Sequence, residues 1–187
     1  MQAFLVSTAI VALAEIGDKS QMLVLTLATH FRKPLPIILG ILAATLLNHV
    51  AAAELGAWLA VTMSTRSLRW IMCLSFIGIA IWPLIPVKPA SNAPMADGIG
   101  VFATTLCTFF LLEMGDKTQF ATFALAANYH SPLTVVAGTT LGILLADVPV
   151  VILSAAAARR LPWRSVRGVA TAMFMGLAVV ALLEVVR

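Results

Sequence analysis

Two copies of one short motif carry acidic, basic and amide side chains into otherwise apolar parts of the chain. Residues 15–21 read EIGDKSQ, and residues 113–119 read EMGDKTQ. The motif offers carboxylate and amide oxygens but no histidine or cysteine. Such hard oxygen ligands suit Mg²⁺, Ca²⁺ and Mn²⁺, whereas zinc and copper prefer imidazole and sulfur. The motif therefore predicts a site for a hard divalent cation, to which Gln21 and Gln119 could add amide oxygens.

The charges within the two motifs predict how such a site would work. On a continuous helix Glu15 and Asp18 share one face, and Lys19 comes within reach of an ion pair with Glu15. The second motif repeats this pattern with Glu113, Asp116 and Lys117. A charged residue inside a bilayer costs about 2.5–3.5 kcal/mol, so we expect the motifs to meet. Four carboxylates and two lysines then leave two negative charges, which one divalent cation or two protons would neutralise.

Weaker signals surround the motifs. Gly17 and Gly115 are predicted to let two helices approach closely. Polar residues also occur in the second span of each half: Asn48 and His49 in one, and Asp147 near Pro149 in the other. They have two interpretations: a supporting shell or proton path, or polar groups that bridge packed helices. Met22 has Phe120 as its repeat mate, which favours packing or lipid contact over metal binding. Four further residues are expected at membrane interfaces: His30, His130, Glu54 and Glu184.

The motifs belong to a duplication that covers nearly the whole chain. An offset of 98 residues aligns them, and without a gap it also aligns Gly40 with Gly138, residues 66–69 (RSLR) with 164–167 (RSVR), and His49 with Asp147. We predict a first repeat at residues 1–86, a linker at 87–97 and a second repeat at 98–187. With three spans in each repeat, the second would be inverted, as in many secondary transporters whose substrate site lies at the repeat interface.

Composition indicates a membrane protein. Of the 187 residues, 61% are hydrophobic and 11% are charged, and the mean hydropathy is +1.02. Globular proteins are about half apolar and a quarter charged. Six apolar stretches are long enough to span a bilayer, which predicts an all-α transmembrane fold of six helices: residues 3–29, 35–61, 69–86, 98–128, 133–157 and 168–185. The first stretch lacks a basic leader and a cleavage site, so we interpret it as a retained helix and not a signal peptide.

The net charge of +4 is distributed by side of the membrane and is not the pattern of a nucleic-acid-binding protein. Seven basic loop residues fall on the face opposite the N-terminus, and three fall on the N-terminal face. The positive-inside rule then predicts extracytoplasmic termini and a cytoplasmic linker. Cys73 and Cys107 lie in apolar spans without a shared motif, so we expect buried thiols.

The doubled motif resembles the two signatures of the MneA-type family of cation/proton exchangers. Bacterial members of that family export manganese, and Golgi members handle manganese and calcium. The resemblance covers the whole chain, and the short linker is similar to that of the bacterial exporters. It implies metal coordination by Glu15, Asp18, Glu113 and Asp116, with Lys19 and Lys117 beside them. It implies transported Mn²⁺ or Ca²⁺ exchanged for protons, membrane lipid as the surroundings, and no prosthetic group.

Two other classes of function remain as alternatives to an antiporter. A passive divalent cation channel would need a continuous polar file through several helices, and the spans outside the motifs are very apolar. A membrane hydrolase could use paired carboxylates and a metal, but no nucleophile or histidine cluster accompanies the motifs. The sequence therefore favours a transporter over an enzyme.

Overall fold

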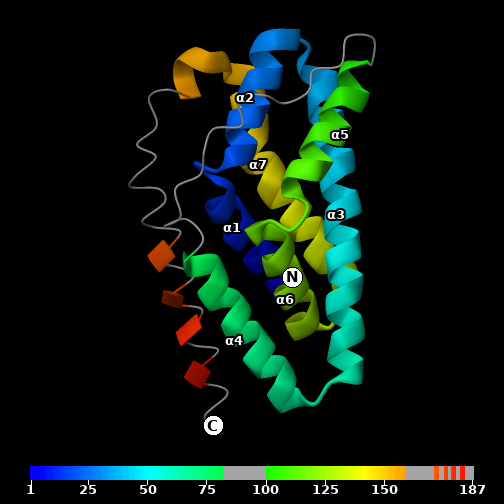
Figure 1. Cartoon of the computed structure of the whole chain (residues 1–187), viewed down its shortest axis with the longest axis vertical. Helices are drawn as coiled ribbons and strands as arrows, with labels where there is room; N and C mark the ends of the chain where they lie inside the picture. The colour runs from blue at the N-terminus through cyan, green and yellow to red at the C-terminus, as the bar shows by residue number, and fades with distance from the viewer. Residues whose placement is uncertain (82–99, 159–170, 173–174, 177, 180–181, 184–187) are drawn as a thin grey trace.

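The computed structural model describes residues 1–81, 100–158, 171–172, 175–176, 178–179 and 182–183. Every element with defined bounds in these ranges is a helix, which confirms the predicted all-helical class for the described residues (Figure 1). The seven helices are α1 (Gln2–Glu15), α2 (Lys19–Phe31), α3 (Pro34–Thr62), α4 (Thr65–Ile81), α5 (Val101–Glu113), α6 (Lys117–Tyr129) and α7 (Pro132–Ala158). The predicted linker and most of the last predicted span lie outside the described residues.

Within the part of the chain that the structure describes, two helices are long and apolar enough to cross a bilayer. They are α3, with 29 residues and a hydropathy of 1.9, and Pro132–Leu153 within α7, with 22 residues and a hydropathy of 2.1. At a rise of about 1.5 Å per residue, both exceed the roughly 30 Å of a hydrocarbon core. Each begins at a proline, Pro34 or Pro132, whose missing N–H costs nothing in the first turn.

The first and fourth predicted spans are each broken at the acidic motif. The prediction of continuous helices over residues 3–29 and 98–128 is therefore wrong. The chain forms α1 and α2 in place of the first predicted span, and α5 and α6 in place of the fourth. Both α1 and α5 are apolar helices, but each is shorter than a membrane span. The motifs thus lie at breaks between paired half-helices.

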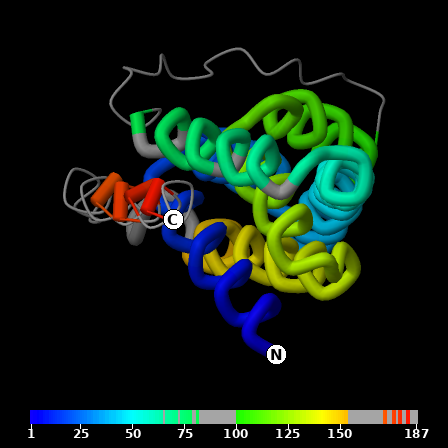
Figure 2. The backbone as a smooth tube through the Cα atoms, turned by 90° about the horizontal axis from the view of Figure 1, so that it is seen from below, coloured from blue at the N-terminus to red at the C-terminus, as the bar shows by residue number. Residues whose placement is uncertain are grey.

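The broken helix in each half of the chain packs against the long helix of the other half. Helix α1 packs along α7, and α2 also lies against α7. In the corresponding way, α5 and α6 both pack along α3, and α3 contacts α7 (Figures 1 and 2). Each long helix therefore supports the broken helix of the other part of the chain.

Two glycines allow this packing. A Cβ atom added at Gly40 of α3 would lie 3.0 Å from the Phe102 carbonyl oxygen of α5. One added at Gly138 of α7 would lie 2.6 Å from the Phe4 carbonyl oxygen of α1. Both contacts are closer than a Cβ normally tolerates. The two contacts are equivalent in the repeat, because Gly138 lies 98 positions after Gly40 and Phe102 lies 98 positions after Phe4. The duplication in the sequence is therefore repeated in the packing.

Large apolar side chains cover much of the outer surface, as expected for a protein that faces lipid. Met22 and Phe120 are both 47% exposed, which agrees with the predicted lipid contact. His30, His130 and Glu54 are exposed, whereas Glu184 lies outside the described residues. Cys73 is buried as predicted. The prediction is wrong for Cys107, which is exposed because it lies on the outward face of α5.

Candidate metal centre

Each acidic motif folds into a type II turn that ends one helix and begins the next. Ile16 has φ −61° and ψ 121°, Gly17 has φ 82°, and the Asp18 N–H donates to the Glu15 carbonyl oxygen over 3.1 Å. A type II turn requires positive φ at its third residue, where glycine is favoured. The second motif repeats the turn, with φ 76° at Gly115. The glycine in Glu-x-Gly-Asp therefore specifies the break.

This turn corrects three predictions made for continuous helices. Among the described residues, nothing beyond its own chain neighbours would lie within 4 Å of a Cβ added at Gly115, so its predicted role in close helix packing is wrong. Glu15 is the last residue of α1 and Asp18 is the N-cap of α2, so they do not share a helical face. The predicted ion pair between Glu15 and Lys19 is likewise wrong, because Lys19 pairs with a different carboxylate.

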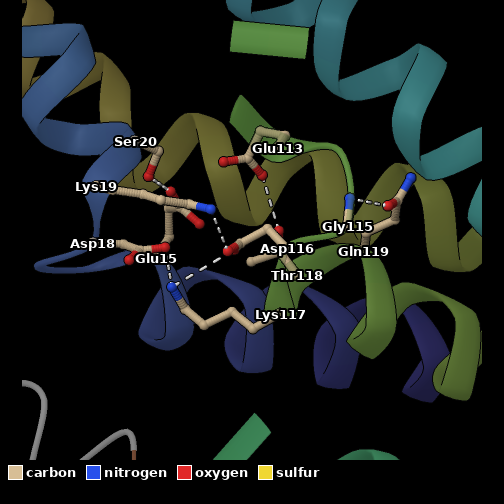
Figure 3. A network of polar contacts seen from close by, with 10 residues as sticks. All are labelled: Glu15, Asp18, Lys19, Ser20, Glu113, Gly115, Asp116, Lys117, Thr118 and Gln119. Atoms are coloured by element: carbon tan, nitrogen blue, oxygen red, sulfur yellow. Dashed lines mark hydrogen bonds and ion pairs between the residues drawn. The ribbon is translucent and has the colours of Figure 1, made fainter. Parts of the chain in front are cut away.

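The lysine of each motif pairs with the aspartate of the other. Lys19 Nζ lies 3.0 Å from Asp116 Oδ1, and Lys117 donates a hydrogen bond to Asp18 (Figure 3). The two aspartates are N-cap residues, yet neither caps its helix with its side chain. Their carboxylates are instead directed to the opposite lysines. The prediction that the two motifs meet is confirmed.

The two motif glutamates lie in the same cluster, but among the described residues neither forms an ion pair with a lysine. The Ser20 hydroxyl donates to Glu15 Oε1, and the Thr118 hydroxyl donates to Glu113 Oε2 over 2.9 Å. The other oxygens, Glu15 Oε2 and Glu113 Oε1, are buried and have no hydrogen-bond partner among the described residues. Because each lysine is paired with an aspartate, the two uncompensated negative charges of the cluster fall on the glutamates.

The glutamates and Asp116 are close enough to share one ion. Single ligand oxygens from Glu15, Glu113 and Asp116 all lie within 4.8 Å of one another, and all three residues are buried. Oxygens that bind one Ca²⁺ at 2.3–2.6 Å can be up to about 5 Å apart. Asp18 lies next to this group but is engaged by Lys117. The geometry therefore fits a hard divalent cation held between the two breaks.

The glutamine of each motif contacts backbone. Gln21 Oε1 accepts the Gly17 N–H over 2.9 Å, and Gln119 Oε1 accepts the Gly115 N–H over 2.6 Å. The sequence contained a signal for this arrangement: an N-cap Asp followed three positions later by Gln resembles a capping box, which marks a helix start. The same stretch holds Ser20 and Thr118, which sequence analysis did not select, although a hydroxyl residue follows Asp-Lys in both copies.

The supporting residues on the long helices separate into two groups. Asn48 donates to the Phe110 carbonyl oxygen over 3.1 Å, and His49 Nδ1 lies 2.9 Å from the Thr139 hydroxyl. Both side chains thus bridge packed helices. Asp147 is fully buried, and neither of its oxygens has a hydrogen-bond partner among the described residues. Its electrostatic neighbours are Glu113, Asp18 and Lys117, so Asp147 lies beside the cluster.

Comparison with known proteins identifies the family. The profile of the family described as divalent cation/proton antiporter GDT1 matches residues 3–91 and 101–187. The chain belongs to this family. A Vibrio cholerae serotype O1 protein named "Putative manganese exporter" is 44% identical over 179 residues, which are 95% of this chain and 89% of the relative. No solved structure matches the chain. Membership in GDT1 confirms the predicted membrane transporter that exchanges a divalent cation for protons, in a family of antiporters and not of enzymes.

Proposed function

We propose that this GDT1 protein exports Mn²⁺ in exchange for protons, through a site centred on Glu15, Glu113 and Asp116. One observation carries this proposal. The reciprocal pairs Lys19–Asp116 and Lys117–Asp18 leave the two glutamates as the uncompensated charges, and each glutamate has a buried oxygen without a hydrogen bond from the described residues. Such oxygens are where a cation would be most stabilised.

The charge balance makes metal and protons alternative loads. A site with two uncompensated negative charges in a low-dielectric setting is costly when empty. One divalent cation, or one proton on each glutamate, removes this cost. Because either load permits the conformational change and the empty site does not, an inward proton gradient can drive the metal outward. Asp18 would join the ligands when Lys117 moves away, and Asp147 offers a carboxylate next to the site.

Manganese is proposed over calcium on the name of the Vibrio relative alone, because the oxygen-only ligands suit both ions. A Ca²⁺/H⁺ antiporter with the same site is the second candidate. A channel has less support, because ion pairs between the two motifs join the two helix breaks to each other. The transported ion is cargo, and the proposed mechanism needs no prosthetic group.

We also propose that residues 1–86 and 98–187 are inverted three-helix repeats, joined by a linker at 87–97. The shared 98-residue offset of helix breaks, ion pairs and glycine contacts supports this arrangement. The protein would lie in a bacterial inner membrane with both termini outside the cytoplasm. Most of the basic residues behind this topology lie outside the described residues, and Arg32 and Lys33, between α2 and α3, are the described pair on the proposed cytoplasmic side.

Flux measurements in proteoliposomes test the proposed function. Vesicles with an acidic interior should accumulate Mn²⁺ against its gradient, because protons leave as Mn²⁺ enters. The pH of the interior should therefore rise during Mn²⁺ uptake. The degree to which added Ca²⁺ or Mg²⁺ inhibits Mn²⁺ flux gives the relative preference of the site for these ions. A double Glu15→Gln/Glu113→Gln variant serves as the control. Mn²⁺ flux that is unchanged when the pH gradient is collapsed at fixed membrane potential would exclude the exchanger and indicate a uniporter.

A further inference from the structure

The two motif glutamines each connect a helix break to the long helix of the other half. Gln21 accepts the Gly17 N–H and donates to the Ala146 carbonyl oxygen of α7 over 2.9 Å. Gln119 accepts the Gly115 N–H and donates to the Asn48 carbonyl oxygen of α3 over 3.4 Å. Ala146 and Asn48 are themselves 98 residues apart, so the two connections are equivalent. We call each of these two-bond connections a brace.

A neutral amide can form both bonds of a brace, whereas an ionised carboxylate cannot. The amide oxygen accepts the turn N–H, while the amide nitrogen donates to the carbonyl oxygen. An ionised glutamate of the same length could accept the first bond but has no hydrogen for the second. A leucine could make neither bond. The side-chain type at this position is therefore explained by the brace alone, without a cation.

The braces act on the parts of the chain that carry the carboxylates. Each turn N–H lies between the glutamate and the aspartate of its motif, so a brace fixes where both carboxylates point. Its other end is the residue directly before Asp147 on α7 or before His49 on α3. A brace thus sets the position of one half's turn relative to the opposite half's long helix. The separation of Glu15 and Glu113 depends on both braces.

We infer that Gln21 and Gln119 are positioning residues that hold the two turns at the spacing required to bind the cation, and are not cation ligands. This inference rests on the proposed function for what the spacing accomplishes, and on the four hydrogen bonds for how it is held. It replaces the sequence-based expectation that these amides supply oxygens to the metal.

The two braces are not equally tight. Both bonds of Gln21 are 2.9 Å long, and Gln21 and Gly17 are buried. The bond from Gln119 to Asn48 is 3.4 Å long, Gln119 is half-buried and Gly115 is exposed. Water can replace a long, exposed hydrogen bond more readily than a short, buried one. Removing the Gln21 brace should therefore have the larger effect.

The test compares Gln21→Glu and Gln21→Leu with wild type in the full-length protein. If Gln21 is a positioning residue, both variants raise the KM for Mn²⁺ roughly tenfold, the change expected for about one net hydrogen bond, with a much smaller change in kcat. If Gln21 is a ligand, a carboxylate in its place keeps or lowers the KM, and that result would overturn the inference. The equivalent Gln119 variants should show a smaller rise.

Hydrogen exchange of the turn provides a readout that does not depend on transport. Exchange in a peptide covering residues 15–21 should be faster in Gln21→Leu than in wild type, in the absence of metal. The matched control is Thr26→Val on the same helix, because the Thr26 hydroxyl bonds only to its own helix at the Met22 carbonyl oxygen. It should change neither exchange nor KM. Unchanged exchange in Gln21→Leu would contradict the brace, and faster exchange with an unchanged KM would contradict its positioning role. If wild type moved no Mn²⁺, the proposed function would fail, while the exchange result would still decide the brace.

Discussion

Lys19 of the first motif lies 3.0 Å from Asp116 of the second, and Lys117 of the second motif forms the equivalent ion pair with Asp18 of the first. Each lysine thus neutralises a carboxylate that its own motif does not contain. The pairs are not equally buried: the Lys117 side chain is 3% exposed and the Lys19 side chain is 19% exposed. This difference leads to a prediction about stability.

Lys117→Met should destabilise the protein strongly, because it leaves Asp18 as a buried charge without its partner. Breaking such a pair from one side costs about 3–5 kcal/mol. Lys19→Met should cost less, because water reaches its side chain. Thermal unfolding in detergent measures both effects. The double variant Lys117→Met/Asp18→Asn should recover much of the lost stability without recovering transport. Equal melting temperatures for Lys117→Met and wild type would contradict the pairing.

The glutamates and the aspartates should respond differently to neutralisation. Glu15→Gln and Glu113→Gln should abolish Mn²⁺ transport while the protein remains folded, because they remove only charges that no lysine compensates. Asp18→Asn and Asp116→Asn should abolish transport and also lower the melting temperature, since Asp18→Asn leaves Lys117 with only Asp116 at 3.8 Å and Asp116→Asn removes the carboxylate that pairs with Lys19. Flux and thermal unfolding on the same purified samples separate these outcomes. Full activity in a glutamate variant would remove that residue from the proposed site.

The turn glycines should not tolerate a side chain. Gly17→Ala and Gly115→Ala force an L-residue into positive φ, which costs about 1–2 kcal/mol, and alanine also favours continuing the helix through the break. Either variant should lose most Mn²⁺ transport. Gly78→Ala in α4 is the matched control, because its φ is not positive and no described residue outside its own helix backbone lies within 4 Å of an added Cβ there. An active Gly115→Ala protein would show that the break is not needed.

Cysteine labelling tests the proposed orientation. In a protein with Cys73→Ala and Cys107→Ala, a cysteine at Lys33 should react with a membrane-impermeant reagent only from the cytoplasm. A cysteine at Ser64, between α3 and α4, should react only from the opposite side. Both positions are exposed, so failure to label reflects the membrane and not burial. The reverse pattern of reactivity would invert the proposed topology.

The sequence predicted the chemistry of the site better than its geometry. Residue types and the 98-residue repeat were sufficient to place Glu15, Asp18, Glu113 and Asp116 together, because isolated charges are too costly in a membrane. The partners were predicted wrongly because hydrophobicity alone indicated one continuous helix. The turn glycine and the Asp-x-x-Gln helix start are both present in the sequence. However, the apolar residues on both sides made the whole stretch resemble a single membrane-spanning helix.

The tertiary contacts could not be predicted from local pattern. Nothing in the spacing within one motif shows that Lys19 would reach Asp116, since that pair joins residues 97 positions apart. Likewise, Asn48 and Ala146 accept the glutamine bonds through backbone carbonyl oxygens, which every residue has. Such contacts depend on how the long helices cross the opposite breaks, and only the three-dimensional structure shows this.

The cross-half ion pairs also impose an order on biogenesis. Helices α1 and α2 are synthesised first and carry Glu15, Asp18 and Lys19, but the partners of Asp18 and Lys19 are on a helix made about a hundred residues later. Before α6 has been synthesised, Asp18 and Lys19 lack their ion-pair partners, so placing them at their final depth in the bilayer costs free energy. The first break should therefore remain near water or beside the insertion machinery during synthesis, and it should reach its final depth only when the second break emerges to meet it.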